Sequence, residues 1–356
     1  MSAHSNTLMR SLKLFAVALP LLTARLAAQR DIGSSGPGNT TIRGFVDVDW
    51  ASGSDKLDRR AGFSLGQYDL FISSKLTDRV SFLGETVFEF SPEANSFGVD
   101  VERVIVSYEI DDHFRVLGGK VHTPIGYWNN AYHHGRAFQP TIERPLTFQF
   151  EDEGGALPVH TTGLQVSGRD LTEAHLGFDV LLGNALGNRP IPDTNSTPSV
   201  TVALHSQISP ALRVGVSAYR DQAIAGTATP RGDSLTSRLT QTIAGAFLSY
   251  IGERHEAIAE FEQVRNSASG RRTTSPGWFV YAGIRATPNL IPYVMHDQLK
   301  LAANDPYFAM SDNKREILGL RWEQSAALVM KAELRSIDNT VRGRSTDAAL
   351  QVAVAF

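Results

Sequence analysis

The chain has 356 residues, of which 42 % are hydrophobic and 20 % charged, and its formal net charge is −3. This composition is typical of a folded protein and excludes a disordered one. The acidic balance excludes nucleic acid as an expected partner, and the absence of cysteine excludes disulfides and thiolate metal sites.

The N-terminus has the three-part order of an export signal. Arg10 and Lys13 precede an apolar core that is too short to span a bilayer, and small residues lead up to Ala28. Removing residues 1–28 takes away three basic residues and no acidic ones, which leaves 31 basic against 37 acidic residues and a net charge near −6. The sequence predicts a signal peptide (1–28), a short N-terminal segment (29–40) and a single domain (41–356).

Beyond the signal, apolar and polar residues alternate with a period of two in many segments. In "TIRGFVDVDW", one face carries Val46, Val48 and Trp50 and the other carries Asp47 and Asp49. No run of about 18 apolar residues predicts a transmembrane helix. A soluble sandwich tends to have shorter strands, whereas a barrel in a bilayer needs long strands with an apolar outside and a polar inside. The pattern predicts an all-β, transmembrane antiparallel β-barrel.

The alternating segments predict a barrel of about 16 strands. They lie at 41–51, 62–76, 79–90, 99–110, 114–122, 160–169, 174–184, 199–208, 211–221, 238–251, 254–265, 277–287, 289–301, 313–324, 326–337 and 346–356. Short connections suit the periplasmic side of such a barrel, and longer ones rich in Gly, Ser, Thr, Asn, Asp and Pro suit the external side. The predicted long connections are 51–61, 185–198, 222–237, 266–276 and 302–312.

The chain ends on an alternating strand, "DAALQVAVAF", whose one face carries Leu350, Val352, Val354 and the terminal Phe356. A terminal aromatic residue on such a strand resembles the C-terminal signature by which bacterial outer-membrane barrels are recognised and inserted. Together with the signal peptide, it predicts the bacterial outer membrane as the location, with lipid and lipopolysaccharide as partners.

One segment, 123–158, fits neither the strand nor the helical period and is far longer than an ordinary connection. Its aromatic residues, among them Tyr127 and Trp128, need somewhere to pack. Because a barrel of this size encloses an aqueous lumen, we expect the segment to fold inward as a constriction loop. The predicted constriction residues are Lys120, His122, Tyr127, His133, His134, Arg136, Arg144, Glu151, Asp152, Glu153 and His160.

Charged residues of both signs fall on the polar faces of the predicted strands. Those predicted to line the pore are Arg43, Asp47, Asp49, Asp69, Glu85, Arg103, Glu260, Arg285, Arg321, Lys331 and Arg335. A mixed lining favours a transverse field across the constriction over strong selectivity for anions.

The stretches "GGKVHTPIGYWN", "YHHG", "ERP" and "FEDEGGALPVHTTGLQVSG" resemble the corresponding region of bacterial outer-membrane porins similar to the phosphate-selective porin O and P family. The motif resemblance is confined to about 115–170 and the last strand. It implies a sixteen-stranded barrel, usually trimeric, that passes small hydrophilic solutes by diffusion. Because this chain is net acidic, phosphate specificity is not expected to carry over.

The prediction is therefore a passive porin for small hydrophilic solutes or ions, a homotrimer without a cofactor. The alternative is a plugged or closed barrel that acts as a receptor, an adhesin or a structural protein. An enzyme is disfavoured because no Gly-x-Ser-x-Gly motif occurs. The histidines and the acidic triplet 151–153 offer enough ligands for a metal, but their spacing matches no compact site, so none is predicted.

Overall fold

The computed structural model describes residues 40–53, 61–91, 96–133, 135–150, 154–186, 195–340 and 343–356. The predicted signal peptide and all but the last residue of segment 29–40 lie outside the described residues. Among the residues described, no helix is long and apolar enough to cross a membrane.

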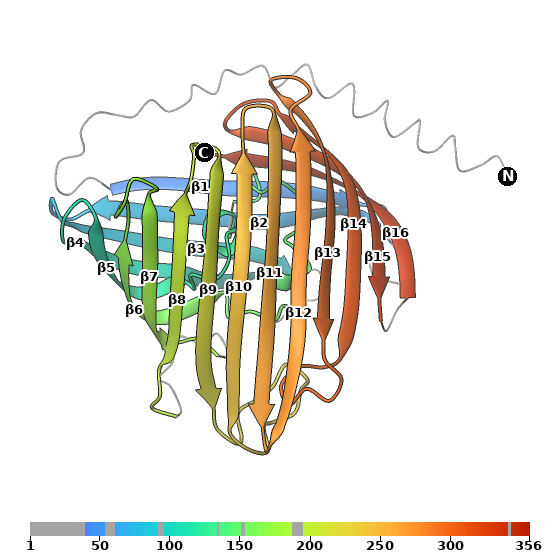
Figure 1. Ribbon diagram of the computed structural model, residues 1–356. Helices are drawn as coiled ribbons and strands as arrows, with labels where there is room; N and C mark the ends of the chain where they lie inside the picture. The colour runs from blue at the N-terminus through green and yellow to red at the C-terminus, as the bar shows by residue number, and fades with distance from the viewer. Residues whose placement is uncertain are drawn as a thin grey trace. The chain divides into compact units, whose positions relative to one another are not determined.

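The described strands form one closed antiparallel barrel in which each strand pairs with its neighbours in sequence and β1 pairs with β16 (Figure 1). The sixteen strands are β1 (Thr40–Ala51), β2 (Gly62–Lys75), β3 (Val80–Ser91), β4 (Ser96–Glu109), β5 (Phe114–His122), β6 (His160–Gly168), β7 (Leu176–Asn184), β8 (Ser199–Gln207), β9 (Leu212–Ala223), β10 (Leu239–Ile251), β11 (His255–Ala268), β12 (Arg271–Ile284), β13 (Leu290–Leu301), β14 (Ser311–Glu323), β15 (Leu328–Asn339) and β16 (Gly343–Ala355). The prediction of an all-β barrel of about 16 strands is confirmed.

The barrel is closed by the two ends of the chain. Phe45 to Ala51 pair with Ala355 to Ala349, and the backbones of Gly44 and Phe356 exchange two hydrogen bonds of 2.9 Å. The Phe356 ring stacks against Tyr68 of β2 at a centroid distance of 6.2 Å. Closure removes the unpaired strand edges that an open sheet would leave, so backbone donors and acceptors are satisfied by neighbouring strands.

The two faces of the barrel wall differ in polarity, as the alternation predicts. Leu318 of β14 is 58 % exposed and Leu334 of β15 is 58 % exposed on the outer face, whereas the neighbouring Arg315 is 1 % exposed. The outer face is therefore largely apolar, and many of the buried charged side chains lie on the inner face.

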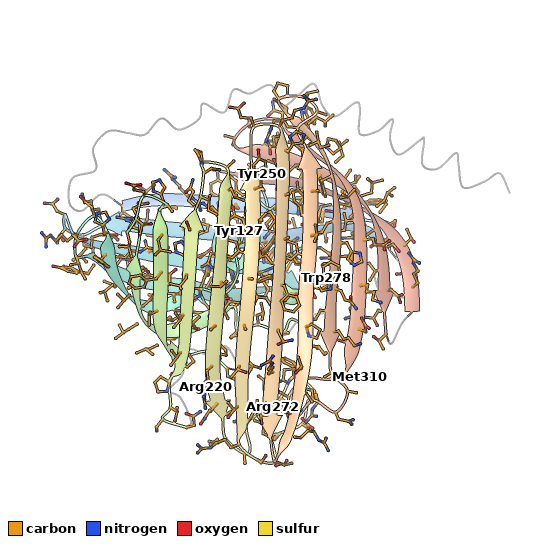
Figure 2. All side chains as sticks on the ribbon, in the orientation of Figure 1. Tyr127, Arg220, Tyr250, Arg272, Trp278 and Met310 are labelled. Carbon is orange, nitrogen blue, oxygen red and sulfur yellow. The ribbon has the colours of Figure 1, made fainter. Side chains whose placement is uncertain are left out.

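The connections define two ends of the barrel. The short-turn end holds the turns around 76–79, 110–113, 169–175, 208–211, 252–254, 285–289 and 324–327, and the long-loop end holds the others. Short turns are fixed by side chains: the Asp111 carboxylate accepts the amide hydrogens of His113 and Phe114 at 2.8 and 2.9 Å, which lowers the pKa of Asp111. Figure 2 shows Tyr250 toward the short-turn end and Arg272 at the opposite end.

The prediction of a long connection at 266–276 is wrong. Strand β11 continues to Ala268, and β12 already begins at Arg271. Only Ser269 and Gly270 form the turn between them. Both turn residues have positive φ angles, 49° and 75°, which is the pairing that a two-residue hairpin with right-handed twist requires. Polar residues such as Thr273 and Thr274, expected in a loop, therefore belong to a paired strand.

Candidate functional site

The most distinctive feature is the segment between β5 and β6, residues 123–159, here named the insert. It contains a single helical turn, α2 (Trp128–Ala131), and a short 3-10 turn, η3 (Leu146–Phe148). Most of its described side chains are buried, although it has almost no regular structure. Its position must therefore be fixed by contacts with the barrel wall.

The insert shares an apolar core with β11, β12 and β13. Trp128 and Phe148, both fully buried, pack edge-on against Phe279 of β12 with centroid distances of 5.5 and 6.2 Å. The same cluster includes Ile258 of β11 and Tyr293 of β13. These wall residues lie on the face opposite the exposed apolar one, and the insert packs against that face.

Glu260 of β11 fixes the beginning of α2. Its two carboxylate oxygens accept the amide hydrogens of Tyr127 and Trp128 at 2.6 and 2.7 Å. A carboxylate suits this position because the first amides of a helix have no partner within the helix. Gly126 has a φ of 67°, and a Cβ atom there would lie 2.4 Å from Glu260 Oε2 and 2.6 Å from the Phe148 ring, so only glycine fits.

Acidic residues of two further strands bind backbone amides of the insert. Asp297 of β13 accepts from the amide of Leu146 at 2.8 Å, and Glu333 of β15 accepts from the amide of Ile142 at 2.8 Å. Arg315 of β14 links Asp297 to the insert. Its guanidinium donates to Asp297 at 2.8 Å and to Glu143 of the insert at 2.7 Å. A buried charge is tolerated when it is paired and hydrogen-bonded in this way.

Basic residues of β15 bind the same part of the insert. Arg335 donates to Glu143 at 2.7 Å and to Asp347 of β16 at 2.6 Å. The Lys331 ammonium donates to the carbonyl oxygens of Thr141, at 3.1 Å, and Arg136. These predicted pore-lining residues are therefore held between the wall and the insert.

The insert also contacts β1, the strand that pairs with β16 where the barrel closes. Arg136 donates to Asp49 at 2.8 Å and to Asp47 at 3.3 Å, and the Phe138 ring contacts Phe45 at 5.1 Å. One segment thus connects strands that are six places apart around the ring, from β11 to β1.

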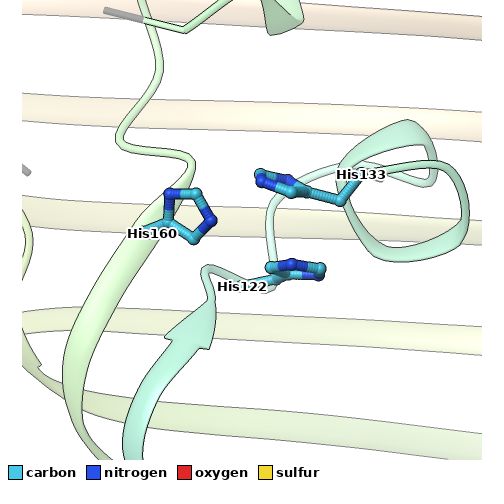
Figure 3. A group of neighbouring side chains, drawn as sticks. All are labelled: His122, His133 and His160. Atoms are coloured by element: carbon cyan, nitrogen blue, oxygen red, sulfur yellow. The ribbon is translucent and has the colours of Figure 1, made fainter. Parts of the chain in front are cut away.

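Three histidines meet where the insert joins the barrel. His122 ends β5, His160 begins β6 and His133 lies in the insert, and one ligand nitrogen from each lies within 4.8 Å of the others (Figure 3). Arg144 also lies here, with one guanidinium nitrogen 3.3 Å from His133 Nδ1 and its charge over the Phe150 ring at 4.2 Å.

Cavities lie on both sides of the insert. One of about 410 Å³ near the long-loop end is lined by Asp49, Gln67, Arg136 and Glu143. Another of about 500 Å³, toward the short-turn end, lies between the insert and β6 to β9 and is lined by Gln165, Asp179, His205 and Arg213 among others. A third, of about 560 Å³, lies beside Arg285 and Glu323.

The predicted site residues fall into three groups. Those that contact the insert or belong to it are His122, Tyr127, His133, Arg136, Arg144, His160, Asp47, Asp49, Glu260, Arg321, Lys331 and Arg335. Those held elsewhere are Lys120, which donates to the carbonyl of Val101, Glu85 with Arg103, Arg285 with Glu323, the buried Asp69 and the exposed Arg43. His134, Glu151, Asp152 and Glu153 lie outside the described residues.

Several residues of the site were not predicted from the sequence. Glu143, Asp297 and Asp347 bind the buried arginines, Asn129 orients His133, and Glu102 of β4 approaches His160. Their only sequence signal is a charged or polar residue next to a predicted inward position or inside the long segment. That signal does not distinguish a residue that binds the insert from one that faces water.

The chain matches no family model, and no curated protein matches it by sequence. Solved structures with the same fold include OmpT, an outer-membrane protein of Vibrio cholerae (TM-score 0.64, 11 % identity, covering 92 % of this chain and 100 % of that one). An anion-selective porin from Comamonas acidovorans (TM-score 0.63, 12 % identity, 90 % and 100 %) and the outer-membrane channel DcaP of Acinetobacter baumannii (0.58, 11 %, 91 % and 99 %) are also similar. At these identities the likeness establishes the fold. The resemblance to phosphate-selective porins stays a prediction.

Proposed function

We propose that this protein is a porin of the bacterial outer membrane, in which small hydrophilic solutes or ions diffuse through a barrel that the insert narrows. The observation that carries the proposal is the position of the insert between cavities of about 410 and 500 Å³. A segment bound to the inner face, with space on either side of it, suits a constricted channel. Transport would need no turnover, cofactor or energy input.

The contacts of the insert support its role as an inward constriction. It binds Asp49 of β1, Glu260 of β11 and Glu333 of β15, which belong to separate parts of one closed ring. Their side chains lie on the wall face opposite the apolar outer surface. A segment that reaches all three through that face would cross the space that the ring encloses.

The outer surface supports a location in the outer membrane. A closed barrel with an apolar outside meets the requirement that lipid leaves no backbone group without a partner. Lipid and lipopolysaccharide would cover this surface, and the short-turn end would face the periplasm. The predicted export signal agrees with this location, and the predicted homotrimer has a precedent in the Vibrio cholerae OmpT structure described as a trimer form.

Selectivity would be set mainly by the cavity beside β6 to β9. Arg115, Arg169 and Arg213 line it together with Asp170 and Asp179, so both charge signs face the solute path. A mixed lining of this kind supports weak selectivity between small ions rather than a phosphate-specific path.

Single-channel recording tests the proposal. We expect the purified, refolded protein to produce stepwise openings in a planar bilayer, and the reversal potential in a salt gradient to give the sign of selectivity. A second function, a plugged barrel that serves as a receptor, an adhesin or a structural protein, is favoured by the dense bonding of the insert to the wall. Silence from a correctly folded barrel would support the plugged barrel and overturn the porin.

A further inference from the structure

The three histidines that meet where the insert joins the barrel come from three separate points of the chain. His122 and His133 stack with a centroid distance of 3.8 Å, and His160 lies 4.3 Å from His133 and 5.5 Å from His122. His133 and His160 are both 2 % exposed. His122 is half-buried. Three imidazoles held this close together are an uncommon arrangement, because each can become charged on protonation and would repel its neighbours.

The orientation of His133 follows from its partner Asn129. The Asn129 side-chain nitrogen donates to the carbonyl oxygens of Thr123, at 2.8 Å, and Val159, at 3.0 Å. Its oxygen must then face His133 Nδ1, at 2.7 Å, and accept a hydrogen from it. This tautomer has its lone pair on Nε2, the atom with which a histidine can ligate a metal.

His160 has an acidic neighbour. Its Nε2 lies 2.7 Å from Oε2 of the buried Glu102, which is an ion-pair distance when the ring is protonated. Histidines that bind metals commonly donate their second ring hydrogen to a carboxylate or amide oxygen, which fixes the ring and raises its basicity. His133 has this outer partner in Asn129, and the carboxylate of Glu102 lies beside His160.

We propose that His122, His133 and His160 bind one divalent transition-metal ion, with zinc as the best-fitting candidate. Imidazole ligands suit zinc and its neighbours, and three histidines with a nearby carboxylate form a recurrent donor set. At a Zn–N distance of about 2.1 Å, tetrahedral ligand atoms lie about 3.4 Å apart. The present atoms, within 4.8 Å of one another, reach that spacing if the stacked rings of His122 and His133 tilt toward His160.

The charges around the cluster determine its affinity. Glu102 supplies a buried negative charge at His160, whereas the Arg144 guanidinium, 3.3 Å from His133 Nδ1, opposes a cation. Arg144 lies over Phe150 at 4.2 Å, and a small shift along this ring would increase its distance from the ion. Because the ion would join the end of β5, the start of β6 and the insert, it would fasten both ends of the insert to its middle.

Zinc binding to the tag-free, refolded full chain tests this proposal directly. After treatment with a chelator, calorimetric titration with zinc chloride should show one ion per chain, with a dissociation constant on the order of a micromolar or lower. Cobalt in place of zinc should give the visible absorption of a tetrahedral site, and X-ray absorption on the zinc form should count three imidazoles. No binding to the wild type, or fewer than three imidazoles, would overturn the site.

Matched variants locate the ion. His133→Gln and His160→Gln should each weaken zinc binding at least tenfold, whereas His296→Gln, a half-exposed histidine beside Trp278 on β13, should leave it unchanged. Zinc should raise the melting temperature of the wild type and of His296→Gln but not of His133→Gln. Equal binding by all four proteins would refute the proposal. These measurements need no ionic current, so their failure is distinguishable from failure of the proposed porin.

Discussion

Two sectors of the barrel wall present different inner faces. The anchored wall, β11 to β15, holds the insert through Glu260, Asp297, Arg315, Glu333 and Arg335. The open wall, β6 to β9, lines a cavity of about 500 Å³ with residues such as Gln165, His205 and Arg213. Both carry charge on the inner face, but the named residues of the open wall line a cavity, whereas the named residues of the anchored wall bind the insert.

The two sectors of the wall use their inward-facing charges differently. On the anchored wall, the five charges named above are buried and bonded to the backbone or to an opposite charge of the insert, so they fix the insert in place. On the open wall, charges are partly exposed and act on whatever enters the cavity. Facing the inside of a barrel is therefore not sufficient evidence that a residue filters solutes.

The largest effect should come from removing what the anchored wall holds. Replacing residues 133–153 by a short Gly-Ser linker should raise single-channel conductance several-fold, roughly threefold or more, because a barrel of this size encloses a wide lumen. A short deletion of the exposed residues 230–233, in the connection after β9, is the control and should change conductance little. Unchanged conductance in a folded 133–153 deletion would show that the insert does not limit the pore.

Breaking one anchor should mainly cost stability. Asp297→Ala removes the acceptor of the Leu146 amide and one partner of Arg315, leaving a buried guanidinium with Glu143 as its main counter-charge. Removing one member of a buried ion pair costs about 3 to 5 kcal/mol in free energy of unfolding. Urea unfolding in detergent measures this loss in the free energy of unfolding.

The matched control for this anchor is Asp312→Ala. Its carboxylate accepts a hydrogen bond from Gln298 at 2.6 Å across the same pair of strands, β13 and β14, but it is only half-buried. We expect a loss below about 1.5 kcal/mol, the contribution of an ordinary hydrogen bond. If Asp297→Ala costs no more than Asp312→Ala, the anchored wall does not differ from the rest.

The barrel itself could be predicted from the sequence because strand length and alternation are local properties. The terminal strand, the turn positions and the inward placement of Asp47 and Asp49 follow from the same period. The failure at 266–276 has a local cause too: Thr273 and Thr274 have loop-forming chemistry, but a tight turn at Ser269 and Gly270 places them in β12.

The anchored wall could not be predicted in the same way. On β13 the buried inner face carries Tyr293, Met295 and Leu299, while Lys300 and the half-buried Gln298 face outward. This reverses the expected polarity because these side chains share an apolar cluster with the insert. The histidine cluster likewise depends on the path of the insert, since His122, His133 and His160 are separated by 11 and 27 positions in the sequence.

Charge reversal on the open wall should change selectivity and leave stability nearly intact. Arg213→Glu replaces a positive charge that lines the cavity with a negative one. The reversal potential should therefore shift in the direction of cation selectivity, with the cation-to-anion permeability ratio rising about twofold. Arg272→Glu, at the long-loop end away from this cavity, is the charge-matched control (Figure 2). Equal shifts in both variants would mean that overall charge, and not the open wall, sets selectivity.

The smallest effect should come from an ion pair on the open side of the barrel. Arg169 and Glu109 lie 3.5 Å apart, and their side chains are 52 % and 36 % exposed. Such exposed pairs contribute about 0.2 to 1 kcal/mol, because water and salt screen the charges. We expect Arg169→Ala to reduce the free energy of unfolding by no more than this amount, and the difference to vanish in high salt.

The value of this last variant is its contrast with Asp297→Ala under one assay. Both remove one member of an ion pair from the same barrel, but one pair is buried beneath the insert and the other meets solvent. Salt should leave the cost of the buried pair nearly unchanged, because mobile ions do not reach it, and should abolish the cost of the exposed pair. A similar salt dependence for both would mean that solvent reaches Asp297 and Arg315, and that the insert is bound more loosely than its contacts indicate.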